Sequence, residues 1–191
     1  MSPTILIFGI LIFIGVMFIA VGIAIYNSLV GRQIETKNAW SQIDVQLKRR
    51  YDLIPNLVET VKGYASHERE TLEKVVQARN MAMGARSVGE QAQAENMLTG
   101  ALKSLFAVSE AYPDLKANQE FLKLQEELTG TENRIGFARQ HYNDSVSSYN
   151  ETLQRFPGNV VGNMFGFRPA EFFRLDEAEA AAVQKAPQIK F

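Results

Sequence analysis

The sequence predicts an all-α protein, in which an N-terminal transmembrane helix continues into an elongated antiparallel four-helix bundle, with a short apolar C-terminal segment and a tail. Three observations support this prediction. Residues 5–25 contain only apolar side chains and glycine. From residue 26 to residue 156, apolar residues recur every three or four positions, the period of helices that pack lengthwise. No strand-like alternation occurs before residue 170.

The chain therefore divides into four expected parts. They are a transmembrane anchor over residues 1–26, a helical bundle over 27–156, an apolar, glycine-spaced, membrane-proximal segment over 157–170, and a C-terminal tail over 171–191. The net charge is −1, so no strong field favours nucleic acid, and we expect no nucleic-acid partner. The sequence has no cysteine, which excludes disulfides, thiol catalysis and cysteine-based metal sites.

The uncharged run at the N-terminus indicates the anchor. As a helix, residues 5–25 would span about 31 Å at roughly 1.5 Å per residue, which matches the hydrocarbon core of a bilayer. A buried core helix rarely stays uncharged over this length, and a signal peptide would have a basic start and a shorter run. Tyr26 fits the aromatic belt at a membrane interface. Basic residues follow the run at Arg32 and Lys37 and do not precede it, so we expect the N-terminus outside and the body in the cytoplasm.

Four helices are expected in the body, over residues 27–64, 66–83, 87–112 and 114–155. Pro55 removes one backbone donor from the first helix and is expected to kink it without ending it, because the apolar period continues. Ser66 is the expected N-cap of the second helix, and Ser87 with Glu90 forms a capping box for the third. If neighbouring helices are antiparallel, their lengths bring Phe156 back to within about one turn of the membrane.

Residues 156–167 are uncharged and lie between Arg155 and Arg168. If they are helical, their glycines form one bare stripe that another helix can approach closely. Three interpretations remain open: the segment dips into the membrane interface beside its own anchor, packs on a neighbouring subunit, or folds back to cap the bundle. The residues expected at this membrane interface or subunit contact are Phe156, Pro157, Gly158, Gly162, Phe165, Gly166 and Phe167.

The tail contains an Ala/Glu-rich stretch over residues 176–186, which is expected to be helical. It ends in alternating apolar residues over 187–191. This end is either an extended segment that docks on a partner or a frayed terminus.

The sequence shows no catalytic constellation. No Glu-x-x-His pair accompanies His67 or His141, and no zinc-protease, phosphate-loop or serine-hydrolase motif is present. We therefore expect no enzymatic activity, no cofactor and no metal. The charged cluster over residues 49–52 is either a solvated face with helical ion pairs or a contact with a partner. The residues expected at an oligomer or partner contact are Trp40, Arg49, Arg50, Asp52 and Pro55.

Several long strings of the sequence resemble the LemA family. They occupy residues 26–30, 37–50, 52–65, 67–68, 111–118, 126–128, 131–135, 142–143, 156–159 and 165–167. The resemblance covers essentially residues 26–170, whereas the tail matches loosely. It implies a bacterial single-pass membrane protein with an N-terminal anchor, a helical-bundle body and no established enzymatic activity. It also implies a link to a membrane heat-shock metalloprotease and to envelope stress, and a related branch resembles proteins of magnetosome membrane formation.

These observations together favour a homo-oligomeric, non-enzymatic scaffold in the bacterial inner membrane. Such a scaffold would contact the lipid bilayer, self-assemble, and organise or shape the membrane. The alternative is an adaptor for another membrane protein, such as an envelope quality-control protease, which would use the residue 49–52 cluster or the tail as its contact.

Overall fold

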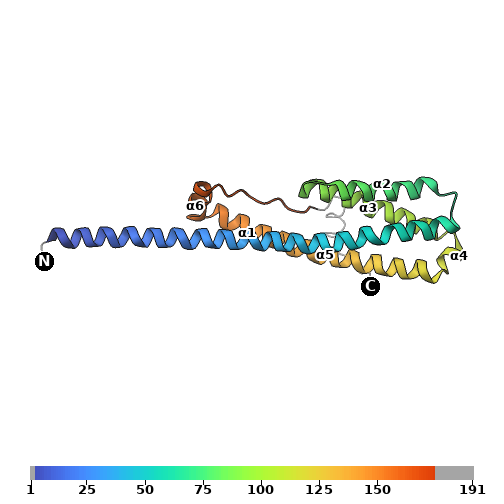
Figure 1. Ribbon diagram of the computed structural model, residues 1–191, viewed down its shortest axis with the longest axis horizontal. Helices are drawn as coiled ribbons and strands as arrows, with labels where there is room; N and C mark the ends of the chain where they lie inside the picture. Colours follow the sequence, from blue (N-terminus) through green and yellow to red (C-terminus); the bar gives the residue numbers. More distant parts are fainter. Residues whose placement is uncertain (1–2, 175–191) are drawn as a thin grey trace, which may run out of the picture.

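A computed structural model describes residues 3–174 and is helical throughout its regular parts (Figure 1). The all-α class is therefore confirmed for the described residues. The helices are α1 (Pro3–Tyr64), α2 (Arg69–Gly84), α3 (Val88–Ser109), α4 (Pro113–Lys116), α5 (Gln119–Gln154) and α6 (Gly158–Phe165). The expected tail helix over 176–186 and the segment over 187–191 lie outside the described residues.

The N-terminal half of α1 projects away from the other helices (Figure 1). Its apolar side chains are exposed, among them Phe8 at 69% and Phe18 at 68%. Within residues 3–174, α1 is the helix that is long and apolar enough to cross a membrane. A large exposed apolar surface is unfavourable in water but is what a lipid environment requires. This part of α1 therefore suggests membrane anchoring.

The second half of α1 is the central element of the body. α5 packs lengthwise along it, and α2 and α3 pair with each other beside its far end (Figure 1). The buried stripe of α1 includes Ile43, Leu47, Ile54, Leu57 and Val61, each no more than 1% exposed. Their spacing of three, four and seven residues places them on one helix face. The apolar period seen in the sequence thus marks the face that is buried.

Helix α1 continues through Pro55 to Tyr64. Proline has no backbone N–H, so the carbonyl four residues earlier, that of Tyr51, loses its usual helical donor. In the structure, Nε of Arg79 in α2 donates to this carbonyl oxygen at 2.8 Å. The gap in the α1 hydrogen bonds is therefore filled by a side chain from α2, which also fixes α2 against α1.

The helix boundaries differ from expectation at three places, the first being the end of α3, which lies at Ser109 rather than at residue 112. Helix α2 begins at Arg69 rather than at residue 66, so Ser66 is not its N-cap. The expected fourth helix is divided into α4 and α5, because the Asn118 side chain accepts a hydrogen bond from Phe121 N at 2.9 Å and starts a new helix. The cap at Ser87 is as expected, with Glu90 N donating to Ser87 Oγ at 3.2 Å.

After α6 the chain turns back along α5. Tyr149 Oη donates to the carbonyl of Arg168 at 2.9 Å, and the Asn150 side chain makes hydrogen bonds with both the N–H and the carbonyl of Ala170. Further along, the Asn143 side chain bonds in the same paired manner to Phe173. The returning segment therefore runs away from α6, and these hydrogen bonds hold α6 against the end of α5.

Candidate functional site

Helix α6 lies beside the end of the apolar half of α1. Val161 is buried in a small core with Leu29 of α1 and with Tyr149 and Leu153 of α5. The Tyr26 ring packs on the ring of Phe165, with centroids 4.8 Å apart, and on that of Phe167, at 5.7 Å. The uncharged segment between the two arginines therefore folds back onto its own chain, and one of its faces caps the end of the body.

The three glycines of this segment have separate roles within the chain. Gly166 adopts a left-handed conformation, with φ of 75°, and ends α6. A Cβ atom at Gly162 would lie 2.3 Å from Leu153 Cδ1, and one at Gly158 would lie 2.1 Å from the carbonyl oxygen of Thr152. At Gly158 and Gly162, the predicted bare stripe is therefore occupied by α5 of the same chain. A contact between α6 and another molecule would have to use the opposite face.

That opposite face is apolar and exposed. Phe156 is 82% exposed, Met164 70%, and Val160 and Phe165 56% each. A cleft of about 500 Å³ lies between α6 and α1. Its lining residues are Phe18, Ile19, Gly22, Ile23, Tyr26, Val161, Met164 and Phe165. We call this cleft, together with exposed Phe156 and Val160, the apolar collar; exposed patches of this kind mark membrane or protein contacts.

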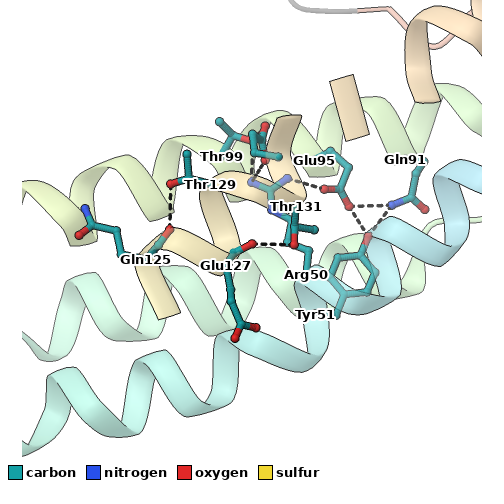
Figure 2. A network of polar contacts seen from close by, with 10 residues as sticks. Arg50, Tyr51, Gln91, Glu95, Thr99, Gln125, Glu127, Thr129 and Thr131 are labelled. Atoms are coloured by element: carbon teal, nitrogen blue, oxygen red, sulfur yellow. Dashed lines mark hydrogen bonds and ion pairs between the residues drawn. The ribbon is translucent and has the colours of Figure 1, made fainter. Parts of the chain in front are cut away.

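Arg50 lies inside the body, not on a surface available to a partner (Figure 2). Its side chain is 3% exposed. It donates to Glu95 Oε2 at 2.9 Å and to Thr99 Oγ1 at 2.8 Å, and it forms an ion pair with Glu132 at 3.1 Å. Arg50 was predicted to contact a partner, but in the structure its side chain connects α1 to α3 and α5 of the same chain. The physical reason is that Arg50 adjoins the buried stripe of α1, where a guanidinium must be paired.

Tyr51 extends the same network (Figure 2). Its hydroxyl donates to Glu95 Oε1, and the Gln91 side chain donates to both of these oxygens, at 2.8 and 3.0 Å. Burial raises the pKa of Tyr51, and the hydrogen bond to Glu95 and the charge of Glu95 raise it further. Burial also raises the pKa of Glu95, and hydrogen bonds from Tyr51 and Gln91 and the charge of Arg50 offset this only in part. The network is a structural clamp whose donors and acceptors are paired with one another.

The other four predicted contact residues are divided between the interior and the surface. Trp40 is half-buried and packs its ring on those of Tyr142 and Phe173, with centroids 5.3 and 5.8 Å away. Arg49, Asp52 and Pro55 are exposed. The structure therefore does not bring the five residues into one surface.

A second surface, which was not predicted from the sequence, lies between α1 and α5; polar side chains (Ser41, Gln42, Arg134 and His141) line it together with apolar ones. It is a groove of about 540 Å³ flanked by Val45, which is 64% exposed, and Phe137, which is 73% exposed. Gln46 also lines it, and its Oε1 is buried with no hydrogen-bond partner among the described residues. We call this surface the body groove. The sequence pattern that could have indicated this groove is the position of Val45 and Phe137, which are apolar but lie outside the buried stripes of α1 and α5.

Within residues 3–174, no group of three or more histidine, cysteine, aspartate or glutamate side chains is placed to hold a metal ion. The two histidines do not meet a carboxylate cluster. The structural features that remain as candidates are the apolar collar and the body groove.

The fold and these surfaces define an all-α protein whose exposed apolar N-terminal helix suggests membrane anchoring. The chain belongs to the LemA family, because the model of that family matches residues 39–191. It is similar to Protein LemA of Metamycoplasma hominis, with 30% identity over 161 residues that cover 82% of this chain and 72% of the relative.

Two further relatives have other names. Magnetosome protein MamQ 2 of Paramagnetospirillum magneticum is 26% identical over 185 residues, covering 83% of this chain and 68% of the relative. Magnetosome protein MamQ of Magnetospirillum gryphiswaldense is 23% identical over 184 residues, with the same coverage of each chain.

Proposed function

We propose that this chain is a non-enzymatic scaffold of the bacterial inner membrane. Residues 1–26 anchor it, its N-terminus lies outside, and its antiparallel helical body stands in the cytoplasm. Copies of the body associate side by side, and the resulting homo-oligomer organises or shapes the membrane in which its anchors are embedded. Relatives named as magnetosome proteins add support for a role in an organised cellular structure.

The observation that carries this proposal is the body groove. Phe137 is 73% exposed and lines the body groove with Val45 of α1, well beyond the apolar run over residues 5–25, where lipid is not available to cover it. Burying a phenylalanine side chain is worth about 1.5–3 kcal/mol, so a protein surface placed over it would gain substantially. A second elongated body laid along α1 and α5 provides such a cover.

The topology is supported by charge. Arg32 and Lys37 are the first basic residues after the uncharged run, and residues 1–4 contain none. Basic residues beside a membrane span are retained on the cytoplasmic side. Helix α5 runs back along α1, so its C-terminal end and α6 lie beside the place where the apolar run of α1 ends (Figure 1). The start of the body in α1 and the end of α5 therefore lie near the same membrane surface.

The natural absence of cysteine allows a direct test. The variant Phe137→Cys is expressed at native level, and the isolated membranes are oxidised with a mild catalyst. We expect a disulfide-linked homodimer, because the groove faces a second copy. The matched control is Lys123→Cys, an exposed polar position on the same helix, which should cross-link far less. Absence of a homodimer at residue 137, in membranes that contain the protein, would contradict self-assembly through this face.

The same experiment distinguishes the adaptor. If Phe137→Cys instead gives one discrete adduct with a different membrane protein, the groove is the docking site for that protein. The exposed part of the residue 49–52 cluster, Arg49 and Asp52, would then be tested by charge reversal. A scaffold should keep its homodimer in those variants, since neither side chain lines the groove.

A further inference from the structure

Three segments of the chain meet at the apolar collar: α1 as it leaves the apolar run, the end of α5, and the segment that returns after α6. On each of them, the first charged residue outside the apolar region is an arginine, namely Arg32, Arg155 and Arg168. The side chain of Arg32 hydrogen-bonds to Ser148 of α5, and the carbonyl of Arg168 accepts from the adjacent Tyr149. Arg32 and Arg168 therefore lie at one level of α5, and Arg155 lies between that level and α6.

Each arginine is followed, farther from the collar, by a glutamate. The direction is set by the structure, because α1 runs away from the collar, α5 runs toward it, and the returning segment runs back along α5 from Tyr149 to Asn143. The three glutamates are Glu35, Glu151 and Glu171, three or four residues behind their arginines. The positive charges thus form the layer nearest the apolar surface, and the negative charges form the next layer.

Two of the three arginines are exposed and therefore accessible to a ligand. The Arg155 side chain is 74% exposed and makes an ion pair with Glu151 at the surface. Arg168 is exposed, and its side chain makes no ion pair with any described residue. Arg32 is half-buried and reaches Ser148. Guanidinium groups bind phosphate oxygens in paired hydrogen bonds, and they do so with a smaller hydration cost than lysine.

We propose that the apolar collar and this arginine layer form a binding site for an anionic phospholipid of the leaflet that faces the body. The acyl chain lies in the cleft between Phe18–Tyr26 and Val161–Phe165, and the arginines bind the phosphate and anionic headgroup. This inference rests on the membrane anchoring in the proposed function. It adds the class of ligand and assigns α6 to lipid rather than to protein.

The choice of lipid over a second copy follows from the position and composition of the site. The cleft includes Phe18 and Ile19, which belong to the run that crosses the bilayer, so its open side faces acyl chains. Gly158 and Gly162, which would let another helix approach closely, are already covered by Thr152 and Leu153. What remains exposed is a set of large apolar side chains beside a basic layer, the arrangement found in interfacial helices that bind anionic lipids.

The first test locates the exposed face of α6. In the full-length chain, Met164→Cys carries a nitroxide spin label, and the protein is reconstituted into phosphatidylcholine bilayers with and without phosphatidylglycerol. We expect the label to collide readily with oxygen and poorly with a water-soluble nickel complex, as a lipid-facing site does. Lys123→Cys, on the body, should show the reverse. A label at residue 164 that is accessible to nickel, or immobile and hidden from both, would overturn the inference.

The second test measures headgroup preference. We compare the retention of phosphatidylglycerol and phosphatidylcholine on the purified protein by native mass spectrometry. The double variant Arg155→Gln/Arg168→Gln should reduce the preference for phosphatidylglycerol by roughly twenty-five-fold, at about five-fold for each basic residue near a membrane surface. The matched control, Lys62→Gln/Arg69→Gln, also removes two exposed positive charges, at the opposite end of the body, and should leave the preference unchanged.

The outcomes separate this inference from the proposed function. Equal retention of both lipids by the parent protein, or an unchanged preference in the double variant, overturns the phospholipid site even if the protein inserts and assembles normally. Failure of the parent protein to incorporate into any bilayer would instead refute the membrane anchoring on which both depend. Added salt provides an internal check, because screening should lower the preference of the parent protein toward that of the double variant.

Discussion

The contact between Arg79 and the Tyr51 carbonyl makes a specific prediction about Pro55. The variant Arg79→Leu leaves this carbonyl with neither its helical donor nor its side-chain donor. An unpaired, buried backbone acceptor costs about 1–3 kcal/mol, and the partial exposure of Arg79 places the expected loss at about 1–2 kcal/mol. For a body of this size, that corresponds to a decrease in melting temperature of about 3–6 °C.

The variant Pro55→Ala completes a double-mutant cycle with Arg79→Leu. Alanine supplies the missing N–H, so the Tyr51 carbonyl regains its helical bond and no longer depends on α2. In this background, Arg79→Leu should cost less than about 0.5 kcal/mol, and the coupling between the two positions should be about 1 kcal/mol. Melting is followed by circular dichroism at 222 nm on the full-length protein in mild detergent. Only the difference between the backgrounds is used, so any stabilisation by the new alanine cancels.

The control for this cycle is Arg86→Leu, which makes the same chemical change at an exposed position between α2 and α3. Its cost should be small and equal in the two backgrounds. If Arg79→Leu is equally destabilising with proline and with alanine at residue 55, the explanation of how α1 tolerates Pro55 is incorrect.

Three further predictions use the same melting assay. Glu95→Leu should lose about 3–5 kcal/mol, because it leaves the buried Arg50 guanidinium without its buried carboxylate, and a much smaller loss would contradict the clamp. Gly162→Ala should lose about 1–3 kcal/mol through the clash with Leu153, with partial recovery in a Leu153→Ala background; an additive double variant would refute the contact. The raised pKa of Tyr51 means that the folded state holds its proton where the unfolded state, with a pKa near 10.0, releases it. Stability from this residue is therefore complete below pH 10.0 and decreases above it, by up to about 1.4 kcal/mol per pH unit, and Tyr51→Phe should lessen the decrease.

The sequence was sufficient for the long helix and its buried face because both depend on local periodicity. Residues such as Ile43 and Leu57 recur with the helical period over many turns, and one proline cannot override that pattern. The Ser87 cap was equally readable, since its partner is three residues away. The division of α4 from α5 was missed because the Asn118 side chain competes with helix continuation, a choice that propensity alone does not decide.

The roles of charged and exposed residues were harder to predict because they depend on distant partners. Arginine is usually a surface residue, and the burial of Arg50 depends on partners distant in the sequence, above all Glu95, 45 positions away. Gly162 matched the pattern of a helix–helix contact, but its neighbour is Leu153 of the same chain. The body groove was missed for a different reason: Val45 and Phe137 lie outside the buried stripes of their helices, but their apolar character alone does not show that they stay exposed.

The central claim is that the membrane-anchored body assembles into a scaffold. The most direct measurement is the mass of the full-length protein extracted in mild detergent, determined by light scattering and followed by imaging of the same chromatographic peak. The account predicts a large, uniform and symmetric particle, with its apolar helices gathered in one belt. A monomer or dimer in that peak would contradict the scaffold and favour an adaptor whose partner co-purifies with it.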